Sequence, residues 1–309
     1  MVKKTLVLVT KEKNKYFPDS CNACELVSLY KTDKTWHRIL RKVVLKLQCP
    51  VVSLLFSHWT KKADQVDTII VFDTGNLPEV LYWLRKRYPR KRIIAWYWNS
   101  VASSIDPARI KAPGIEIWSF DKNDCDKYGF RFNNQFFIPD NIFRINQSTS
   151  NEKYDLFYIG ADKNRAPVLH ELEQALKGTG LTHYFHLVKY KDSTNEFGYE
   201  YYQPLIYPEV LSRVSNARAI VDLVAEWQEG ITLRPLEAIF MGKKLITNMR
   251  NIEQYDLYNK RNIFIIGKDD LKSLPEFLTS DLDESHVDSL KAKYSIEGWL
   301  ANFEVANEE

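Results

Sequence analysis

The chain has 309 residues, of which 45% are hydrophobic and 13% aromatic, and this size and composition indicate two folded domains of ordinary length. The 11 glycines and 12 prolines are too few for long disordered tracts, and no apolar run is long enough to cross a bilayer. The net charge of +3 is unevenly distributed, because residues 1–150 carry +11 and residues 151–309 carry −8, so we expect the N-terminal half to face an anionic partner.

In the first half, short apolar runs alternate with helical segments. Runs rich in Val, Ile and Phe are typical of buried strands, which we expect over residues 5–10, 51–56, 68–72, 92–98, 115–120 and 136–138. Residues 77–88 have helical spacing, and Pro89 ends that helix. This alternation predicts a parallel sheet with helices on both faces.

The polar stretch 139–153 contains proline and a Ser/Thr/Asn cluster, and we place a domain linker there. The alternation then restarts, with strands expected over 154–159, 184–188, 219–224, 245–247 and 263–266. Helices are expected over 166–176, 207–214, 233–241 and 294–304. The sequence therefore predicts an α/β fold of two Rossmann-like domains whose parallel sheets face a central cleft.

Residues 227–248, WQEGITLRPLEAIFMGKKLITN, combine the loop after a buried strand with the start of a helix. Gly230 allows close backbone approach to a ligand, and Thr232 is the predicted N-cap of the helix. Pro235 falls in the first turn, where its missing N–H does little harm. The N-terminus of a helix presents free N–H groups and a partial positive charge, so this segment predicts a phosphate-binding position.

Three charged side chains of this segment add groups suited to a nucleotide sugar. Arg234, in the first turn, can make bidentate contacts to a diphosphate. Glu237, about one turn further on, can accept both hydroxyls of a ribose, and Glu229 can reach hydroxyls of a transferred sugar. The alternative is a surface helix that happens to carry two acidic residues, but the preceding strand, Gly230 and Arg234 favour a donor site.

The E-x7-E spacing from Glu229 to Glu237 resembles the donor-site motif of GT-B retaining glycosyltransferases. The Q-x-G-x-T-x-R-x-x-E pattern that begins at Gln228 is similar to a branch of these enzymes that works on bacterial surface polysaccharides. The sequence YIGADKNR, residues 158–165, resembles the loop on the phosphate side of the donor domain. The similarity extends over residues 154–267.

This resemblance implies a catalytic pair, Glu229 and Arg234, and a donor-binding set made of Gly160, Arg165, Tyr207, Gln228, Gly230, Thr232 and Glu237. By the resemblance, Gly160 approaches the diphosphate, Arg165 contacts it and Tyr207 lies near the nucleotide base. Ile231 and Lys243 depart from the commonest form of the motif, which has an aromatic residue and a proline there. The stereochemical outcome of transfer therefore stays open.

By the same resemblance, residues 1–145 bind the acceptor, residues 146–290 bind the donor, and residues 291–309 form a helix that returns to the first domain. Asp73 follows a strand at the expected cleft end of the first sheet. Its carboxylate is a candidate catalytic base or acceptor-orienting group, and capping of the next helix is the equally weighted alternative. Asn99 ends another strand in a comparable place.

Neither the cysteines nor the paired aspartates predict a metal site. Cys21 and Cys24 lack the second ligand pair of a structural zinc site, and we interpret them as small residues at a helix entrance. The D-x-D triplets at 124–126 and 281–283 resemble the metal-binding motif of GT-A enzymes, but we interpret both as solvated surface. We therefore expect no metal and no cofactor, so that Arg234 and the helix N-terminus offset the leaving-group charge.

Residues 34–47, KTWHRILRKVVLKL, predict a basic amphipathic helix. Its apolar face comprises Trp36, Ile39, Leu40, Val43, Val44 and Leu47, and its basic flank comprises Arg38, Arg41, Lys42 and Lys46. The ordinary interpretation is a helix packed on the core, and the alternative is docking on an anionic membrane. A second basic cluster lies at 85–92. Nucleic acid could use both patches, but no nucleic-acid module is recognisable, so this partner is not expected.

Together these features predict a metal-independent glycosyltransferase. It would move a sugar from a nucleoside-diphosphate sugar, with UDP as one candidate nucleotide, to a glycan or lipid-linked acceptor in bacterial surface polysaccharide biosynthesis. The expected location is the cytoplasm, with peripheral contact at the inner face of the plasma membrane. Two rival hypotheses remain, a nucleotide-sugar epimerase of the same fold and a non-catalytic basic module that docks on membrane or nucleic acid.

Overall fold

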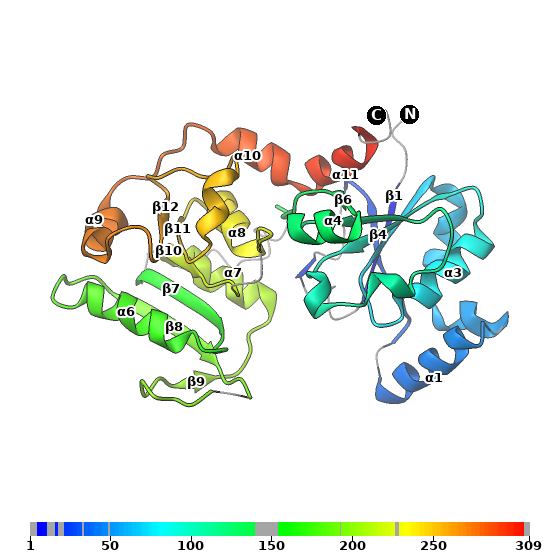
Figure 1. The fold of residues 1–309 in the computed structure, drawn as a ribbon, viewed down its shortest axis with the longest axis horizontal. Coiled ribbons are helices and arrows are strands. Elements are labelled where there is room, and N and C mark those ends of the chain that lie inside the picture. Colours follow the sequence, from blue (N-terminus) through cyan, green and yellow to red (C-terminus); the bar gives the residue numbers. More distant parts are fainter. Residues whose placement is uncertain are drawn as a thin grey trace. The chain divides into compact units, whose positions relative to one another are not determined.

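A computed structural model describes residues 5–10, 16–17, 22–32, 34–48, 50–139, 154–191, 193–225 and 229–305. The chain divides into two compact units (Figure 1): unit 1 is made of Met1–Gln135 and Asn302–Glu309, and unit 2 of Phe136–Ala301. The predicted linker, apart from its first residue, lies outside the described residues, and so does Cys21.

Unit 1 contains one parallel sheet of six strands in the order β2-β1-β3-β4-β5-β6. The strands are β1 (Thr5–Val9), β2 (Glu25–Ser28), β3 (Thr68–Phe72), β4 (Arg92–Tyr97), β5 (Glu116–Ser119) and β6 (Arg131–Phe132). The α-helices are α1 (Thr35–Lys46), α2 (Trp59–Lys62), α3 (Leu77–Arg87) and α4 (Lys122–Tyr128). The strand order changes direction between β1 and β3, which is the position where open α/β sheets bind ligands.

Unit 2 contains a second parallel sheet, in the order β12-β11-β10-β7-β8-β9. Its strands are β7 (Tyr154–Ala161), β8 (His183–Val188), β9 (Tyr201–Tyr202), β10 (Ala217–Asp222), β11 (Lys244–Thr247) and β12 (Ile263–Ile265). Its helices are α6 (Ala166–Leu176), α7 (Tyr207–Ser215), α8 (Leu233–Met241), α9 (Leu274–Thr279) and α10 (Val287–Tyr294). The last helix, α11 (Ile296–Val305), begins in unit 2, and its residues from Asn302 onward belong to unit 1. This strand order is that of the dinucleotide-binding Rossmann fold, with its reversal between β7 and β10.

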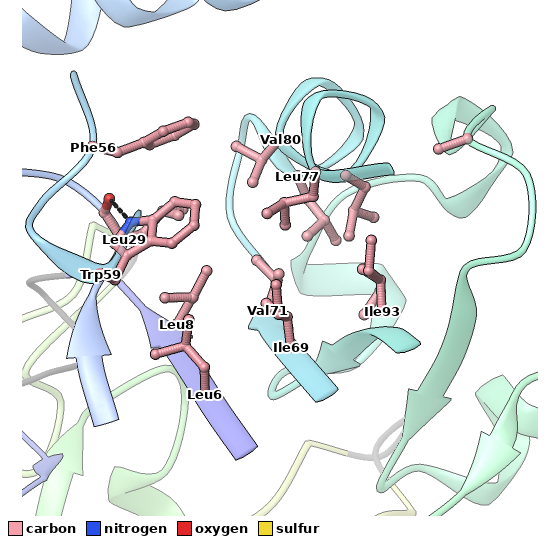
Figure 2. Packing of buried hydrophobic residues seen from close by; sticks show 14 of the residues in the cluster. Leu6, Leu8, Leu29, Phe56, Trp59, Ile69, Val71, Leu77, Val80 and Ile93 are labelled. Atoms are coloured by element: carbon pink, nitrogen blue, oxygen red, sulfur yellow. Dashed lines mark hydrogen bonds between the residues drawn. The ribbon is translucent and has the colours of Figure 1, made fainter. Parts of the chain in front are cut away.

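Alternating side chains of each strand build cores on the two faces of the sheets. In unit 2, Phe157 and Ile159 face one core with α7, α8 and α10, whereas Leu156 and Tyr158 face a second core with α6 and α9. In unit 1, apolar side chains of β1, β3 and β4 pack against α3 (Figure 2). Beside them, the Trp59 indole Nε1–H donates to the Leu29 carbonyl at 2.8 Å, so this buried ring also has its polar atom satisfied.

The expected α/β architecture of two parallel sheets is confirmed, and several elements agree closely in their bounds. Strand 68–72 and helices 166–176 and 233–241 agree residue for residue with β3, α6 and α8. These elements combine a clear hydrophobic period with local start and stop signals, such as Gly242 at the end of α8, whose φ of 62° is left-handed.

The strand expected over 51–56 is wrong, because Pro50–Leu55 is a 3-10 helix. Val52 and Phe56 of this stretch are fully buried, whereas Val51 and Leu54 are exposed, which is a helical rather than an alternating pattern. The strand expected over 136–138 is reduced to an isolated bridge between Phe137 and Ser295.

Most of the apolar face of the helix at 34–47 does not pack on the core, which corrects the ordinary interpretation of this segment, although Val44 is partly buried against the core. The helix forms as α1, but Trp36, Ile39, Leu40, Val43 and Leu47 are exposed. The side chains that it buries are those of Arg41 and Leu45.

The C-terminal helix α11 carries two aromatic side chains, Trp299 and Phe303, that are almost fully buried. Phe303 packs edge-on against Trp118 and Trp96 of unit 1, with ring centroids 4.7 and 6.1 Å away. In unit 2, Trp299 stacks on Phe136 at 4.3 Å. No helix in the described part of the chain is both long and apolar enough to cross a membrane.

Candidate functional site

The reversal of strand order in unit 2 brings the carboxyl ends of β7 and β10 side by side. β7 ends at Ala161 and leads into the loop before α6, and β10 ends at Asp222 and leads toward α8. The loops after these strands leave the sheet on opposite faces, so a crevice for a ligand is expected between them. The predicted donor-site residues Gly160, Arg165 and Arg234 all come from these two segments.

The N-terminus of α8 is anchored to the end of β10 by one hydroxyl. Thr232 is the N-cap, as predicted, and its Oγ1 accepts from the Arg234 backbone N–H at 3.2 Å. The same hydroxyl donates to Asp222 Oδ2 at 3.0 Å. The Thr232 hydroxyl thus both donates and accepts a hydrogen bond. Through these two bonds it fixes the start of α8 next to the end of β10.

Arg234 and Glu237 lie on the same side of α8 and pair with each other. An Arg234 Nη1–H contacts Glu237 Oε2, and the Tyr207 O–H donates to the other oxygen, Oε1, at 3.0 Å. Glu237 is only 1% exposed, so both oxygens of a buried carboxylate are occupied by protein donors. The predicted residues Tyr207, Arg234 and Glu237 therefore lie together, and in this structure the first two donate to the carboxylate of the third.

The end of β7 carries the second arginine of the site. Arg165 Nη1–H lies 3.2 Å from both the Tyr158 hydroxyl and the Ala161 carbonyl. Arg234 Nη2–H lies 3.5 Å from the Ile159 carbonyl of the same strand. Two guanidinium groups from different elements therefore meet the last residues of β7, where they would add positive charge next to a bound phosphate.

Gly160 has a packing reason to be glycine. A Cβ built at this position would lie 2.5 Å from the Tyr158 hydroxyl and 3.3 Å from Arg165 Nη1. Since Tyr158 is buried and contacts Arg165, a side chain at 160 would have to displace the group that orients this arginine. The backbone at Gly160 is thus kept open by a specific tyrosine–arginine contact.

Asp222 interacts electrostatically with Arg234, Arg165 and Glu237, although the sequence interpretation did not single it out. Burial raises the pKa of the Asp222 carboxyl to about 6, while the Thr232 hydrogen bond and the charges of Arg234 and Arg165 oppose the rise, and Glu237 adds to it. Burial also raises the pKa of the Tyr158 hydroxyl. The sequence signal for Asp222 was available, because it is the polar residue that closes the apolar strand AIVD.

The loop that carries the first glutamate of the motif is held through its backbone. The Glu229 carbonyl accepts from the Tyr255 O–H at 2.8 Å and from Asn251 Nδ2–H at 3.5 Å. Its side chain is half-buried, and none of the described residues pairs with its carboxylate. Gly230 is buried, and Gln228 lies outside the described residues. The Glu229 carboxylate is thus available for a ligand hydroxyl.

Asp73 occupies the reversal point of the unit 1 sheet, at the end of β3. Its Oδ1 accepts from the Trp98 N–H at 3.1 Å, and its Oδ2 accepts from Asn99 Nδ2–H at 3.0 Å and Ser104 Oγ–H at 2.6 Å. It is buried and does not cap α3, whose N-cap is Asn76. The carboxylate therefore ties the loop after β4 to the end of β3, and Asn99 belongs to the same network.

One of the D-x-D triplets differs from its expected solvated position. Asp124, in α4, is buried, and its Oδ2 accepts from the Val101 N–H at 2.7 Å. Burial raises the pKa of its carboxyl. Asp283 instead lies in a loop, where its N–H donates to Asn262 Oδ1 at 2.8 Å. Both aspartates thus hold loops in place.

A pocket of about 70 Å³ lies on another side of α8, between this helix, the loop before β12 and α10. Its lining includes Pro235, Ile239, Asn262 and His286 but none of the predicted site residues. The candidate site is therefore defined by the convergent polar side chains at the strand ends and not by this pocket.

The sequence matches no protein-family model and no curated protein. Solved structures do match over nearly the whole chain. A lipopolysaccharide outer core galactosyltransferase, WaaB, is 14% identical with a TM-score of 0.51, and 98% of each chain is covered. An α-glucosyltransferase solved with UDP and a 13-mer DNA is 11% identical with a TM-score of 0.52, covering 97% of this chain and 95% of that one.

A third similar structure is described as a putative UDP-N-acetylglucosamine 2-epimerase from Listeria monocytogenes. It is 11% identical with a TM-score of 0.51, covering 98% of this chain and 95% of that chain. At such identities the likeness concerns the fold alone. With its two six-stranded parallel sheets, the chain has the GT-B fold of these glycosyltransferases and epimerases.

Proposed function

We propose that unit 2 binds a nucleoside-diphosphate sugar at the carboxyl ends of β7 and β10, and that the protein transfers the sugar to an acceptor. The observation that carries this proposal is the convergence of Arg165 and Arg234 on the last residues of β7, beside the capped N-terminus of α8. Two guanidinium groups and a helix N-terminus make a suitable environment for a diphosphate. They would also stabilise the charge that develops on the leaving nucleotide.

In this proposal, the two glutamates of the motif bind different parts of the donor, the ribose and the transferred sugar. Glu237 would accept the ribose hydroxyls after Arg234 turns from the carboxylate toward the diphosphate. Glu229, whose carboxylate has no partner among the described residues, would accept hydroxyls of the transferred sugar. Gln228, Gly230 and Thr232 complete the donor loop, with Tyr207 on the side of the base. Metal-free transfer is part of the proposal, since positive charge already comes from the two arginines.

We further propose a glycan or lipid-linked acceptor in bacterial surface polysaccharide biosynthesis. The motif around Gln228 and the fold shared with a lipopolysaccharide galactosyltransferase support this choice. The acceptor would bind unit 1, the half of the chain with the positive charge excess. Asp73 stays a candidate base only if its hydrogen bonds, including those from Trp98, Asn99 and Ser104, are exchanged during turnover.

A thermal-shift screen against UDP, GDP, CDP, dTDP and their sugars, with and without magnesium, tests the donor site. A ligand at 100 times its dissociation constant stabilises a fold by about 2.7 kcal/mol. We expect one nucleotide to raise the melting temperature and the shift to disappear in Arg165→Ala and Arg234→Ala. Arg261→Ala is the matched control, because this arginine is exposed and lies outside the candidate site. If no nucleotide or nucleotide sugar raised the melting temperature, the proposed donor site would be contradicted.

An epimerase is the second candidate function, because the same fold includes one. The two activities differ in what they need. An epimerase converts UDP-N-acetylglucosamine without an acceptor, whereas a transferase releases the nucleoside diphosphate in proportion to acceptor glycosylated. Incubation of the protein with the stabilising nucleotide sugar alone, followed by analysis of the sugar, distinguishes them.

A further inference from the structure

The exposed apolar side chains of unit 1 are concentrated on one short segment. Of the twelve large hydrophobic residues that are exposed among the described ones, seven lie between residues 36 and 54. They are between 42% and 67% exposed, and they are Trp36, Ile39, Leu40, Val43, Leu47, Val51 and Leu54. We call these seven residues the α1 face. A concentration of this kind marks an interaction site, since single exposed apolar residues are usually scattered.

The α1 face is not needed to hold α1 on its unit, because a different side of the helix does so. Arg41 is buried, with its guanidinium 3.9 Å from the Tyr30 ring centroid and its Nη1–H donating to the Thr32 carbonyl at 3.2 Å. Gln48, just after the helix, donates to the Glu79 carbonyl of α3 at 3.3 Å. Leu45 is fully buried on the same side.

Helical geometry separates three sides of α1. At about 100° per residue, the exposed apolar residues Trp36, Ile39, Leu40, Val43 and Leu47 fall within an arc of about 100°. On one side of this arc follow the exposed Lys46 and then Lys42, whereas Arg38, also exposed, falls next to the buried Leu45. The helix thus presents to solvent an apolar stripe and, beside it, a basic stripe made of Lys42 and Lys46.

The charges within the segment that carries the α1 face have one sign. Residues 34–63 contain seven Lys and Arg and no Asp or Glu. The described residues offer Lys42 and Lys46 no acidic partner. Uncompensated positive charge beside an exposed apolar stripe with a tryptophan matches the helices that lie in the interface of anionic bilayers.

We propose that the α1 face and its basic stripe are a docking surface for an anionic lipid bilayer, on which α1 lies in the plane of the headgroups. A nucleic acid would use the basic stripe but leave the apolar side chains in water. A second copy of the chain, placed symmetrically, would bring two positive stripes together. A bilayer takes up both stripes at once, because its acyl boundary receives the apolar residues and its headgroups receive the lysines. The inference does not depend on the proposed transferase activity.

Co-sedimentation of the full-length protein with vesicles tests the proposal. We expect binding to vesicles of phosphatidylglycerol mixed with phosphatidylcholine and much weaker binding to phosphatidylcholine alone. Since each basic side chain near an anionic surface contributes about fivefold to binding, the double variant Lys42→Glu, Lys46→Glu should lose at least 25-fold. The double variant Ile39→Ser, Val43→Ser should lose at least tenfold on the same vesicles.

Matched controls are available in unit 2. Ile206→Ser removes an apolar side chain that is 55% exposed, and Lys272→Glu reverses an exposed charge, and neither should change vesicle binding. All substituted side chains are exposed, so circular dichroism and melting should match the wild type. No binding to the mixed vesicles, or binding that the Ile39/Val43 variant retains in full, overturns the proposal. So does a dimer, seen by light scattering, that this variant converts to a monomer.

Discussion

Arg234 and Glu237 contact each other across one turn of α8, and Tyr207 holds the second oxygen of the same carboxylate at 3.0 Å. Arg234, predicted to contact the diphosphate, and Glu237, predicted to bind the ribose, therefore neutralise each other's charge in this structure. A bound diphosphate would compete with Glu237 for the Arg234 guanidinium. If Arg234 moved to the diphosphate, Oε2 of Glu237 would lose its partner and become available. In the proposed function, binding of the phosphates thus prepares the position for the ribose.

The first prediction concerns the stability that this pair provides. Glu237→Ala should lower the free energy of unfolding by about 3 kcal/mol, because it leaves the arginine and the Tyr207 hydroxyl without their buried partner. Urea unfolding without nucleotide measures this loss. Glu171→Ala, on the exposed side of α6, is the control and should change it by less than about 0.5 kcal/mol. Equal stability of the two variants would show that the pair contributes nothing to the fold.

The second prediction concerns the close contact at Gly160. Gly160→Ala should destabilise the protein by about 1–3 kcal/mol, since the new Cβ would lie 2.5 Å from the Tyr158 hydroxyl. In a Tyr158→Phe background the same substitution should cost less, because the clashing oxygen is gone. A double-mutant cycle by urea unfolding gives the coupling between the two positions. A coupling free energy of zero would contradict the contact.

The third prediction concerns pH and the buried carboxyl of Asp222. Its pKa is raised by burial to about 6 from 3.8, so the folded protein binds this proton more tightly than the unfolded chain does. The resulting destabilisation is fully present above pH 6 and is relieved as the pH falls from 6 toward 4. A shift of this size corresponds to about 3 kcal/mol.

Asp222→Asn isolates this contribution, because an amide oxygen can still accept from Thr232 and carries no charge at any pH. The variant should be more stable than the wild type at pH 8, and the difference should shrink toward pH 5. Denaturant unfolding at both values measures it. A difference that stays constant between pH 5 and pH 8 would mean that Asp222 does not titrate in this range.

Much of the fold could be predicted from local patterns, and the exceptions have physical causes. Strand β3 is apolar from Ile69 to Phe72 and buried on both faces, which the run TIIVF indicates directly. The run at 51–56 is also mostly apolar, but Pro50–Leu55 is a 3-10 helix, which buries Val52 and leaves Val51 and Leu54 exposed. β6 and β9 have two residues each, which is too short for any hydrophobic period to appear.

The candidate site was predictable where its signal is local. The Thr232 cap follows from helix-start chemistry within three residues. The tyrosine partners of Glu237 and Arg165 were not predictable, because Tyr207 and Tyr158 reach them from other elements. Asp222 shows the same limit, since the pKa of its carboxyl is raised mainly by burial, and both this burial and the opposing charges of Arg234 and Arg165 arise only in the folded sheet.

The last prediction compares two tryptophans of unit 1 that are close in sequence and opposite in environment. Trp59 is 0% exposed and its indole N–H donates to the Leu29 carbonyl, whereas Trp36 on α1 is 60% exposed. Trp59→Phe should lower the free energy of unfolding by about 2–4 kcal/mol, because it opens a cavity and removes the indole hydrogen bond to the Leu29 carbonyl, which among the described residues then keeps only the Ser57 N–H as a donor. Trp36→Phe should change it by less than about 0.5 kcal/mol. Urea unfolding of both variants measures this contrast, and a stability loss at Trp36 that equals the loss at Trp59 would mean that α1 packs by its apolar face after all.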